Sequence, residues 1–387
     1  MIIPFNKPVM PNDFNDILSK TIRDGWLTTG PVVNIFEERL KEYLNSENVV
    51  AVNSCTAALH LAIAAFQYDT RDKFIAPTYT FVATVEAGEY LGLNPVLIDS
   101  DKNYNIDLNQ IEDVLKKDNK IKCIIPVHFG GMPVDMESLN FLREKYGINI
   151  IEDAAHAFES ISNTGKVGDT KDAACFSFYA NKNITTAGEG GAISTNNSKY
   201  AEKIRKLSLH GMSKDGWKRF AKGGKWAYDV SELGYKYNLT DVAAAFGLWQ
   251  FGQVSKWSNR RSEIVRIYRK NFKNIPNLLS RSELPKNIKH ANHLFIVRID
   301  NKYWKINRDS VIEKLNKSGI GTSVHYIPIH MHSYYYKKYG FKANDFPVSK
   351  NLYEQVITLP LYPSLKAEEV QYISEVFLDI WNKNKKN

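Results

Sequence analysis

The chain has 387 residues, of which 43% are hydrophobic and 24% are charged, and its formal net charge is +9. These values are typical of a soluble globular protein with room for one large domain and one smaller domain. No stretch approaches the roughly eighteen uninterrupted apolar residues that a membrane helix needs, so we expect no membrane association.

The start of the chain and its cysteines indicate a cytoplasmic protein. The segment after Met1 lacks the basic-then-apolar pattern of a secretory signal. Cys55, Cys123 and Cys175 are odd in number and show no CxxC spacing, so we expect free thiols and no metal ion. Much of the positive charge lies in the tail and in residues 214–225. It indicates either a solvated surface or a surface for an anionic small substrate, and no nucleic-acid signature accompanies it.

Short apolar runs alternate with helix-like segments along the first half of the chain. This order predicts an α/β fold with a mainly parallel sheet. Helices are expected directly after the first two strands, at Thr56–Ala65 and Thr80–Leu91. The predicted strands are Val49–Asn53, Phe74–Pro77, Pro95–Asp99, Lys122–Val127, Asn149–Glu152, Ala173–Phe178 and Gly191–Thr195.

The pattern changes beyond about residue 250, which predicts a domain boundary there. A long polar helix, Gln253–Lys273, is followed by antiparallel-looking strands at His293–Ile299 and Thr322–Tyr326 and by closing helices. We therefore predict a large α/β domain with an N-terminal arm at 1–255 and a smaller α+β domain at 256–387.

Chemically useful residues follow several predicted strands, at the sheet edge where parallel α/β proteins bind ligands. Ser54, Cys55 and Thr56 lie between the first strand and a helix, where free N–H groups and the helix dipole form a phosphate seat. Ser and Thr are also ordinary helix caps. Phe81 offers either an aromatic face or core packing. Asp153 ends an apolar strand, as a helix cap or as a carboxylate that needs a cationic partner.

Lys182 follows the sixth strand, and the glycine-rich segment Gly188–Gly191 then turns back into another strand. A lysine in a loop is usually solvated. Here the surrounding pattern holds the amine at the sheet edge in a protected place. Such a lysine can have a lowered pKa and can form a Schiff base with a carbonyl.

These residues together fit the needs of pyridoxal phosphate. That cofactor requires a lysine for its aldehyde, a carboxylate for its ring nitrogen, an aromatic side chain against its ring, and a phosphate cup. The residues that meet these needs are Lys182, Asp153, Phe81, and Ser54–Thr56 with Ser177.

Longer motifs then identify a family. The chain resembles the DegT family of nucleotide-sugar aminotransferases, a fold-type I group of pyridoxal-phosphate enzymes, nearly from end to end. Within the family, Ser177–Gly191, Gly234–Asp241 and Gly319–His325 are most similar to the aminotransferase that makes UDP-4-amino-4-deoxy-L-arabinose. The motifs that carry the family resemblance are Gly25–Pro31, Asn53–Leu61, Pro77–Thr84, Glu152–His156, Gly188–Gly191 and Leu359–Leu361.

The resemblance implies a role for each residue around the cofactor. Lys182 would bind the aldehyde, Asp153 would face the ring nitrogen, and Phe81 would stack on the ring. His156 would lie near the other ring face or the ring hydroxyl, although many relatives carry Gln there. Cys55 also departs from the family, in which Gly is commoner at this position.

The resemblance also implies a homodimer with shared active sites. In the family, a neighbouring subunit donates an asparagine to the cofactor phosphate. Lys236 and Asn238 are both candidates for that contact in this chain. The small-residue helix Thr240–Gly247 suits close packing between subunits.

The implied substrates are a nucleotide-linked keto sugar and L-glutamate, which leaves as 2-oxoglutarate. Thr29 and Tyr179 would contact substrate, and His325 and Tyr326 would line the sugar side of the site. Arg219, in the basic segment 214–225, either closes over the sugar-nucleotide diphosphate or belongs to a solvated loop.

The implied reaction is amino transfer in cell-surface polysaccharide biosynthesis, with the 4-keto sugar expected and a 3-keto sugar as an alternative. Glutamate would displace Lys182 from the cofactor, and the freed amine would carry protons in both half-reactions. A dehydratase branch of the family carries His in place of Lys182. A catalytically silent regulator would be expected to lose Lys182 or Asp153. A nicotinamide enzyme would need GxGxxG directly after the first strand.

Overall fold

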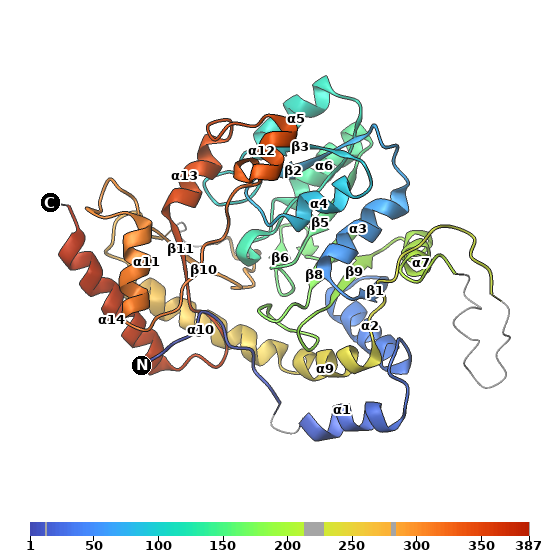
Figure 1. The fold of residues 1–387 in the computed structure, drawn as a ribbon, viewed down its shortest axis with the longest axis horizontal. Coiled ribbons are helices and arrows are strands. Elements are labelled where there is room, and N and C mark those ends of the chain that lie inside the picture. The colour runs from blue at the N-terminus through green and yellow to red at the C-terminus, as the bar shows by residue number, and fades with distance from the viewer. Residues whose placement is uncertain (12–13, 213–227, 280–283, 387) are drawn as a thin grey trace.

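The computed structural model describes residues 1–11, 14–212, 228–279 and 284–386. A seven-stranded sheet forms its centre, in the order β1-β9-β8-β5-β4-β2-β3 (Figure 1). Its strands are β1 (Asn48–Val52), β2 (Lys73–Pro77), β3 (Asn94–Ile98), β4 (Ile121–Ile124), β5 (Asn149–Asp153), β8 (Ala173–Ser177) and β9 (Gly191–Thr195).

The sheet is mainly parallel, which confirms the predicted fold class. Strand β9 pairs antiparallel with both of its neighbours, β1 and β8, whereas β8, β5, β4, β2 and β3 pair in parallel. Every residue of β8 and β9 is buried. Strands covered on both faces read as continuous apolar runs, which is why the pattern of the sequence located them.

Helices surround the sheet, and α3 packs directly on β8 and β9. Its alanines, including Ala57, Ala58 and Ala62, let the helix lie close to the strands. Among the described residues, no helix is both long and apolar enough to cross a bilayer. The helices are α1 (Phe14–Arg23), α2 (Pro31–Leu44), α3 (Cys55–Phe66), α4 (Ala83–Glu89), α5 (Leu108–Lys117), α6 (Met136–Tyr146), α7 (Ser198–Leu207), α9 (Asp241–Phe251), α10 (Val254–Phe272), α11 (Arg308–Lys317), α12 (Ser333–Tyr339), α13 (Pro347–Gln355) and α14 (Ala367–Asn384).

The C-terminal part has a hydrophobic core of its own. Helices α10, α11 and α14 lie with the two-stranded sheet β10 (Phe295–Arg298) and β11 (Val356–Leu359) on one side of the molecule (Figure 1). Tyr268, Phe272, Phe295 and Phe377 stack within this core. Ile3 of the N-terminal arm packs into the same core. A domain boundary near residue 255 stays a prediction.

Three predicted elements differ from the structure. Thr322–Tyr326 is not a strand, because it makes only a single bridge, from Ser323 to Thr358. The strand that pairs with β10 is β11. Strand β4 ends before Pro126, which has no N–H for the ladder. Helix α4 begins at Ala83, three residues later than predicted.

Two buried aspartates connect segments far apart in the sequence. Asp241, at the start of α9, accepts hydrogen bonds from the main-chain N–H groups of Gly30, Val32 and Val33 at the start of α2 (2.8–3.1 Å). Asp99, after β3, accepts in the same way from residues 348 and 349 at the start of α13. Carboxylates stabilise helix N-termini, so these contacts fix α2 against α9 and α13 against the end of β3.

Gly191 begins β9 directly against the turn between β1 and α3. A Cβ atom built on Gly191 would lie 2.5 Å from the carbonyl carbon of Ser54 and 2.7 Å from the nitrogen of Cys55. Both are main-chain atoms at the start of α3, so neither can move without displacing the turn.

We expect Gly191→Ala to destabilise the protein by about 1–3 kcal/mol, because its methyl group overpacks main-chain atoms. The matched control is Gly252→Ala, since a Cβ there meets nothing closer than 3.4 Å. Thermal unfolding of both variants checks this. A melting temperature for Gly191→Ala equal to that of Gly252→Ala would contradict the close packing.

Candidate active site

The carboxyl ends of β5 and β8 bring Asp153 and Lys182 to the same edge of the sheet. Asp153 pairs in register with Cys175, and the thiol of Cys55 donates to the Cys175 carbonyl (3.5 Å). The loop after β8 folds back on itself, since the N–H of Lys182 donates to the Tyr179 carbonyl (2.9 Å). This loop holds the lysine at the position predicted from the sequence.

The electrostatics of Lys182 depend mainly on its burial. Burial lowers the pKa of Lys182 to about 8, and the nearby groups of Cys55 and Asp153 oppose that shift. Burial raises the pKa of the Cys55 thiol, and the Asp153 carboxylate raises it further. A substantial fraction of Lys182 is therefore a neutral amine near pH 8, the form that attacks a carbonyl or accepts a proton.

Asp153 is buried and hydrogen-bonded through both carboxylate oxygens. The hydroxyl of Thr84 donates to Oδ2 (2.7 Å), and the N–H of Ala155 donates to Oδ1 (3.1 Å). Burial raises the pKa of Asp153, while these two bonds and the charges of Lys182 and His128 act in the opposite direction. A carboxylate accepts about four hydrogen bonds, so the lone pairs left over can meet a further donor, and its burial favours a cationic one.

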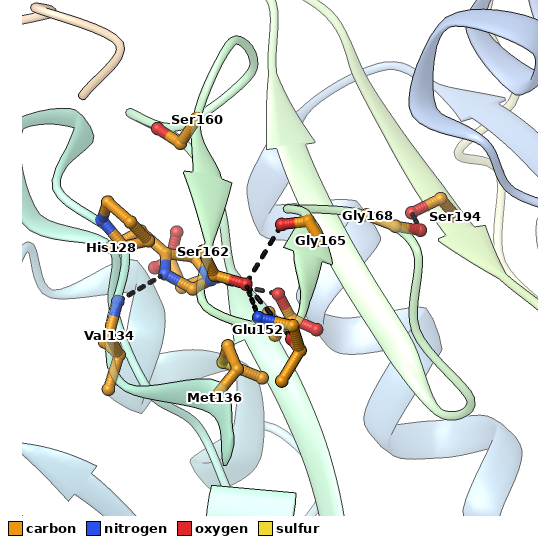
Figure 2. A network of polar contacts seen from close by, with 12 residues as sticks. His128, Val134, Met136, Glu152, Ser160, Ser162, Gly165, Gly168 and Ser194 are labelled. Carbon is orange, nitrogen blue, oxygen red and sulfur yellow. Dashed lines mark hydrogen bonds and ion pairs between the residues drawn. The ribbon is translucent and has the colours of Figure 1, made fainter. Parts of the chain in front are cut away.

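A second buried pair, His128 and Glu152, lies at the end of β5, where Glu152 precedes Asp153 (Figure 2). His128 Nδ1 accepts from the N–H of Val134 (3.0 Å), so its Nε2 carries the proton and donates to Glu152 (3.0 Å). The main-chain N–H of His128 also donates to the Asp153 carbonyl (3.1 Å). His128 therefore anchors the end of β5 twice, through its imidazole and through its main chain.

The start of α3 provides main-chain N–H groups at the same edge. The hydroxyl of Ser54 accepts from the N–H of Ala57 (3.1 Å), which makes Ser54 the N-cap. The N–H groups of Cys55 and Thr56 precede the first intrahelical bond of α3 and point out of the helix. Ser177 pairs in register with Gly191, beside this turn, and its hydroxyl accepts from the N–H of Tyr179 (3.3 Å).

Aromatic side chains form one wall of the site. Phe81 is 56% exposed, and its ring lies 5.8 Å from that of Tyr326. Phe129 packs edge-on against both Tyr326 (6.0 Å) and His156 (6.2 Å). An exposed phenylalanine beside the Tyr326 ring provides a flat apolar face to a planar ligand.

Three histidines near Lys182 are held neutral. His156 Nδ1 accepts from the N–H of Gly130 (3.2 Å), so its Nε2–H donates to the Tyr326 oxygen (3.0 Å). Burial, reinforced by the charge of Lys182, lowers the pKa of His156 and His293 and lowers that of His325 to about 3. The charge of the site therefore rests on Lys182 and Asp153.

The other predicted residues form a separate group near the end of β1. Asn238 donates to the Thr29 hydroxyl (2.7 Å) and accepts from Lys236, and Thr29 donates to the Leu239 carbonyl. This group borders β1 because the N–H of Asn53 donates to residue 237 (2.8 Å). Tyr179 is 46% exposed. Arg219 and the whole of the basic segment 214–225 lie outside the described residues.

Some residues of the site were not predicted from the sequence. Thr84 lies within the Pro77–Thr84 motif, and Asn183 follows Lys182 directly, so both carry a local signal in the sequence. His293 and Arg261 are distant along the chain and carry no such signal. Folding alone brings them to the loop that holds Lys182.

Comparisons with known proteins show the family of the chain. The model of the DegT/DnrJ/EryC1/StrS aminotransferase family matches residues 8–378. The chain belongs to this family. It is 39% identical to the spore coat polysaccharide biosynthesis protein SpsC of Bacillus subtilis, over 98% of this chain and 97% of that protein.

Solved structures of family members share the fold. One is the PMP form of Spr1654 from Streptococcus pneumoniae, which carries the name of a sugar aminotransferase (TM-score 0.90, 31% identity, 98% of this chain and 99% of that chain). Another is PseC of Helicobacter pylori, an aminotransferase of pseudoaminic acid biosynthesis (TM-score 0.90, 28% identity, 99% and 100%).

This family member is therefore a pyridoxal-phosphate-dependent aminotransferase. The described residues fit the cofactor: Asp153 is a buried carboxylate with unused lone pairs, and a substantial fraction of Lys182 is a neutral amine near pH 8. The first turn of α3 provides N–H groups for a phosphate.

The lowered pKa of Lys182 predicts its reactivity. In the protein freed of cofactor, we expect acetylation of Lys182 by acetic anhydride to rise with pH and to have its midpoint near pH 8. An ordinary lysine has its midpoint near 10.4. Peptide mass spectrometry measures the labelling, with exposed lysines as the internal reference for the reagent. A midpoint near 10 would contradict the burial of the amine.

Proposed function

We propose that the protein transfers the amino group of L-glutamate to a 4-keto sugar linked to a nucleotide, in cell-surface polysaccharide biosynthesis. The observation that carries this proposal is the position of the Lys182 amine, whose pKa burial lowers to about 8, at the same sheet edge as the buried Asp153 carboxylate to which it is electrostatically coupled. SpsC and PseC act in the biosynthesis of a polysaccharide and of pseudoaminic acid, which supports a sugar as the amino acceptor. The unpaired cysteines support a cytoplasmic location.

Each residue has a defined task in this proposal. Bound pyridoxal phosphate supplies an aldehyde carbon and an electron-withdrawing ring. Lys182 would hold the aldehyde carbon, and its Nζ, when neutral, would take a proton from the amino donor and return one to the product. Asp153 would face the ring nitrogen as its anionic partner. Phe81 would lie against the ring, and the first turn of α3 with Ser177 would hold the phosphate.

Tyr326 and His325 line the sugar side in this proposal. Because His156 donates to the Tyr326 oxygen, the hydroxyl hydrogen of Tyr326 is free to point toward a sugar oxygen. Burial and the Asp153 carboxylate raise the pKa of Tyr326, so it stays a neutral donor at physiological pH. A neutral, preoriented hydroxyl distinguishes sugars without adding charge to the site.

We further propose a homodimer in which Thr29, Lys236 and Asn238 of each subunit complete the site of the other. The contacts among these three residues hold them as one unit beside the end of β1, with Lys236 exposed. An exposed amine in such a unit can reach the cofactor phosphate of a second subunit. Arg219 stays a candidate for the diphosphate of the substrate.

We expect Asp153→Asn to keep the fold and to lower the rate of the glutamate half-reaction by at least ~100-fold, about 2.7 kcal/mol, because the ring nitrogen loses its anionic partner. Thr84→Val is the matched control, since it removes one hydrogen bond to Asp153 and leaves the charge. We expect a loss of tenfold or less for that variant. Rapid-mixing absorbance with glutamate measures both rates. An Asn variant within about twofold of wild type would remove Asp153 from this role.

The substrate itself is tested with UDP-, dTDP- and GDP-linked 3-keto and 4-keto sugars, with glutamate as the donor. We expect a 4-keto substrate to give an amino-sugar product, detected by mass spectrometry. We expect 2-oxoglutarate to form in an equal amount. Conversion only of 3-keto substrates would correct the position of the ketone. Glutamate turnover without conversion of any nucleotide sugar would contradict the proposed acceptor class.

A further inference from the structure

Asn183, the residue after Lys182, is held by side chains and main chain from two distant segments. Its amide nitrogen donates to Glu159 Oε2 (2.7 Å) and to the Ala291 carbonyl (3.0 Å), and its amide oxygen accepts from His293 Nδ1 (3.1 Å). Both N–H groups are therefore used, and the histidine tautomer is fixed. All four residues are buried.

Arg261 of α10 reaches the same residue from a third segment. Its Nη2 donates to the main-chain carbonyl of Asn183 (3.3 Å), and the residue is only 5% exposed. Burial lowers the pKa of Arg261 to about 10, and the Glu159 carboxylate opposes that shift. A buried charge needs an opposite charge nearby. The Glu159 carboxylate therefore balances the positive charge of the Arg261 guanidinium and also accepts the hydrogen bond from the Asn183 amide.

Hydrogen bonds therefore hold the main chain on both sides of Lys182. Before it, the side chain of Asn6 donates to the Asn181 carbonyl (3.0 Å). After it, Asn183 makes the contacts just described. The side chain of Lys182 carries no hydrogen bond or ion pair to the described residues, which leaves its four-carbon stem able to move while the main chain stays in place.

We propose that Asn183 is a positioning residue for the amine of Lys182, with Glu159 as the residue that orients its amide. This inference rests on the proposed role of Lys182. A reaction in which one amine must attach, detach and carry a proton requires that amine to return to the same point each time. A mobile side chain returns reproducibly only if its main chain is rigid.

The test exchanges an amide for a carboxylate without changing shape. Asn183→Asp removes both N–H donors and places a second carboxylate against Glu159. We expect kcat to fall at least ~tenfold while KM for glutamate changes less than about threefold, because the amine is misplaced and the substrate contacts are kept. Like charges in contact cannot both stay ionised at low cost.

The rescue variant is Asn183→Asp combined with Glu159→Gln. It has the same net charge as the wild type. The amide now lies at position 159 and the carboxylate at position 183, so one N–H donor again faces one carboxylate. We expect kcat to return to within about threefold of wild type. A double variant no faster than Asn183→Asp alone would overturn the proposal, as would an Asn183→Asp variant with unchanged kcat.

A second measurement needs no activity and so separates this inference from the proposed function. In cofactor-free Asn183→Ala, we expect the labelling midpoint of Lys182 to rise by at least ~1 pH unit from about 8, because a loosened main chain lets the amine reach water. The charged or titratable groups that face Lys182 are Cys55, Asp153, His156, His293 and His325.

The matched control is Asn181→Ala, on the other side of the lysine, whose side-chain oxygen has no hydrogen-bond partner. We expect its labelling midpoint to equal that of wild type within experimental error. We expect its kcat to stay within twofold of wild type. An Asn183→Ala midpoint equal to that of Asn181→Ala would overturn the positioning role. If wild-type protein converts no sugar, these labelling results still decide the role of Asn183.

Discussion

The amine of Lys182 and the carboxylate of Asp153 are removed from water at the same edge of the sheet, and the surroundings of each must offset the loss of hydration. Burial lowers the pKa of the amine and raises that of the carboxylate, so each group moves toward its neutral form. Their mutual attraction and the hydrogen bonds to Asp153 act against this tendency. The site is therefore poised between charged and neutral states, which suits a residue that both attacks carbon and moves protons.

The rest of the fold maintains this balance by fixing main chain rather than by adding charge. Gly191 lets β9 contact the turn that begins α3, and His128 anchors the end of β5 through Glu152. Three histidines held neutral lie near the lysine, so none of them adds a positive charge beside it. The C-terminal part contributes His293 and Arg261, which makes the position of α10 and of the segment before β10 part of the active site.

The fold and the centre of the site could be predicted because their signals are local. Buried parallel strands leave continuous apolar runs, and Asp153 and Lys182 follow two of those runs directly. The predicted strand at Thr322–Tyr326 was wrong because an alternating pattern does not show that the chain leaves its partner after one bridge. Contacts such as His293 with Asn183 join residues 110 positions apart, and only packing determines them. The roles proposed for Thr29, Lys236 and Asn238 would require a second subunit, which a single sequence does not describe.

The proposed chemistry requires Lys182 to be the residue to which the cofactor attaches. Borohydride reduction of the holoprotein makes the bond between cofactor and lysine permanent, so proteolysis and peptide mass spectrometry can then locate it. We expect the mass of the reduced cofactor on the peptide that contains Lys182, with one cofactor per chain. Attachment to another lysine, such as Lys236, or a reduced protein without bound cofactor would contradict it.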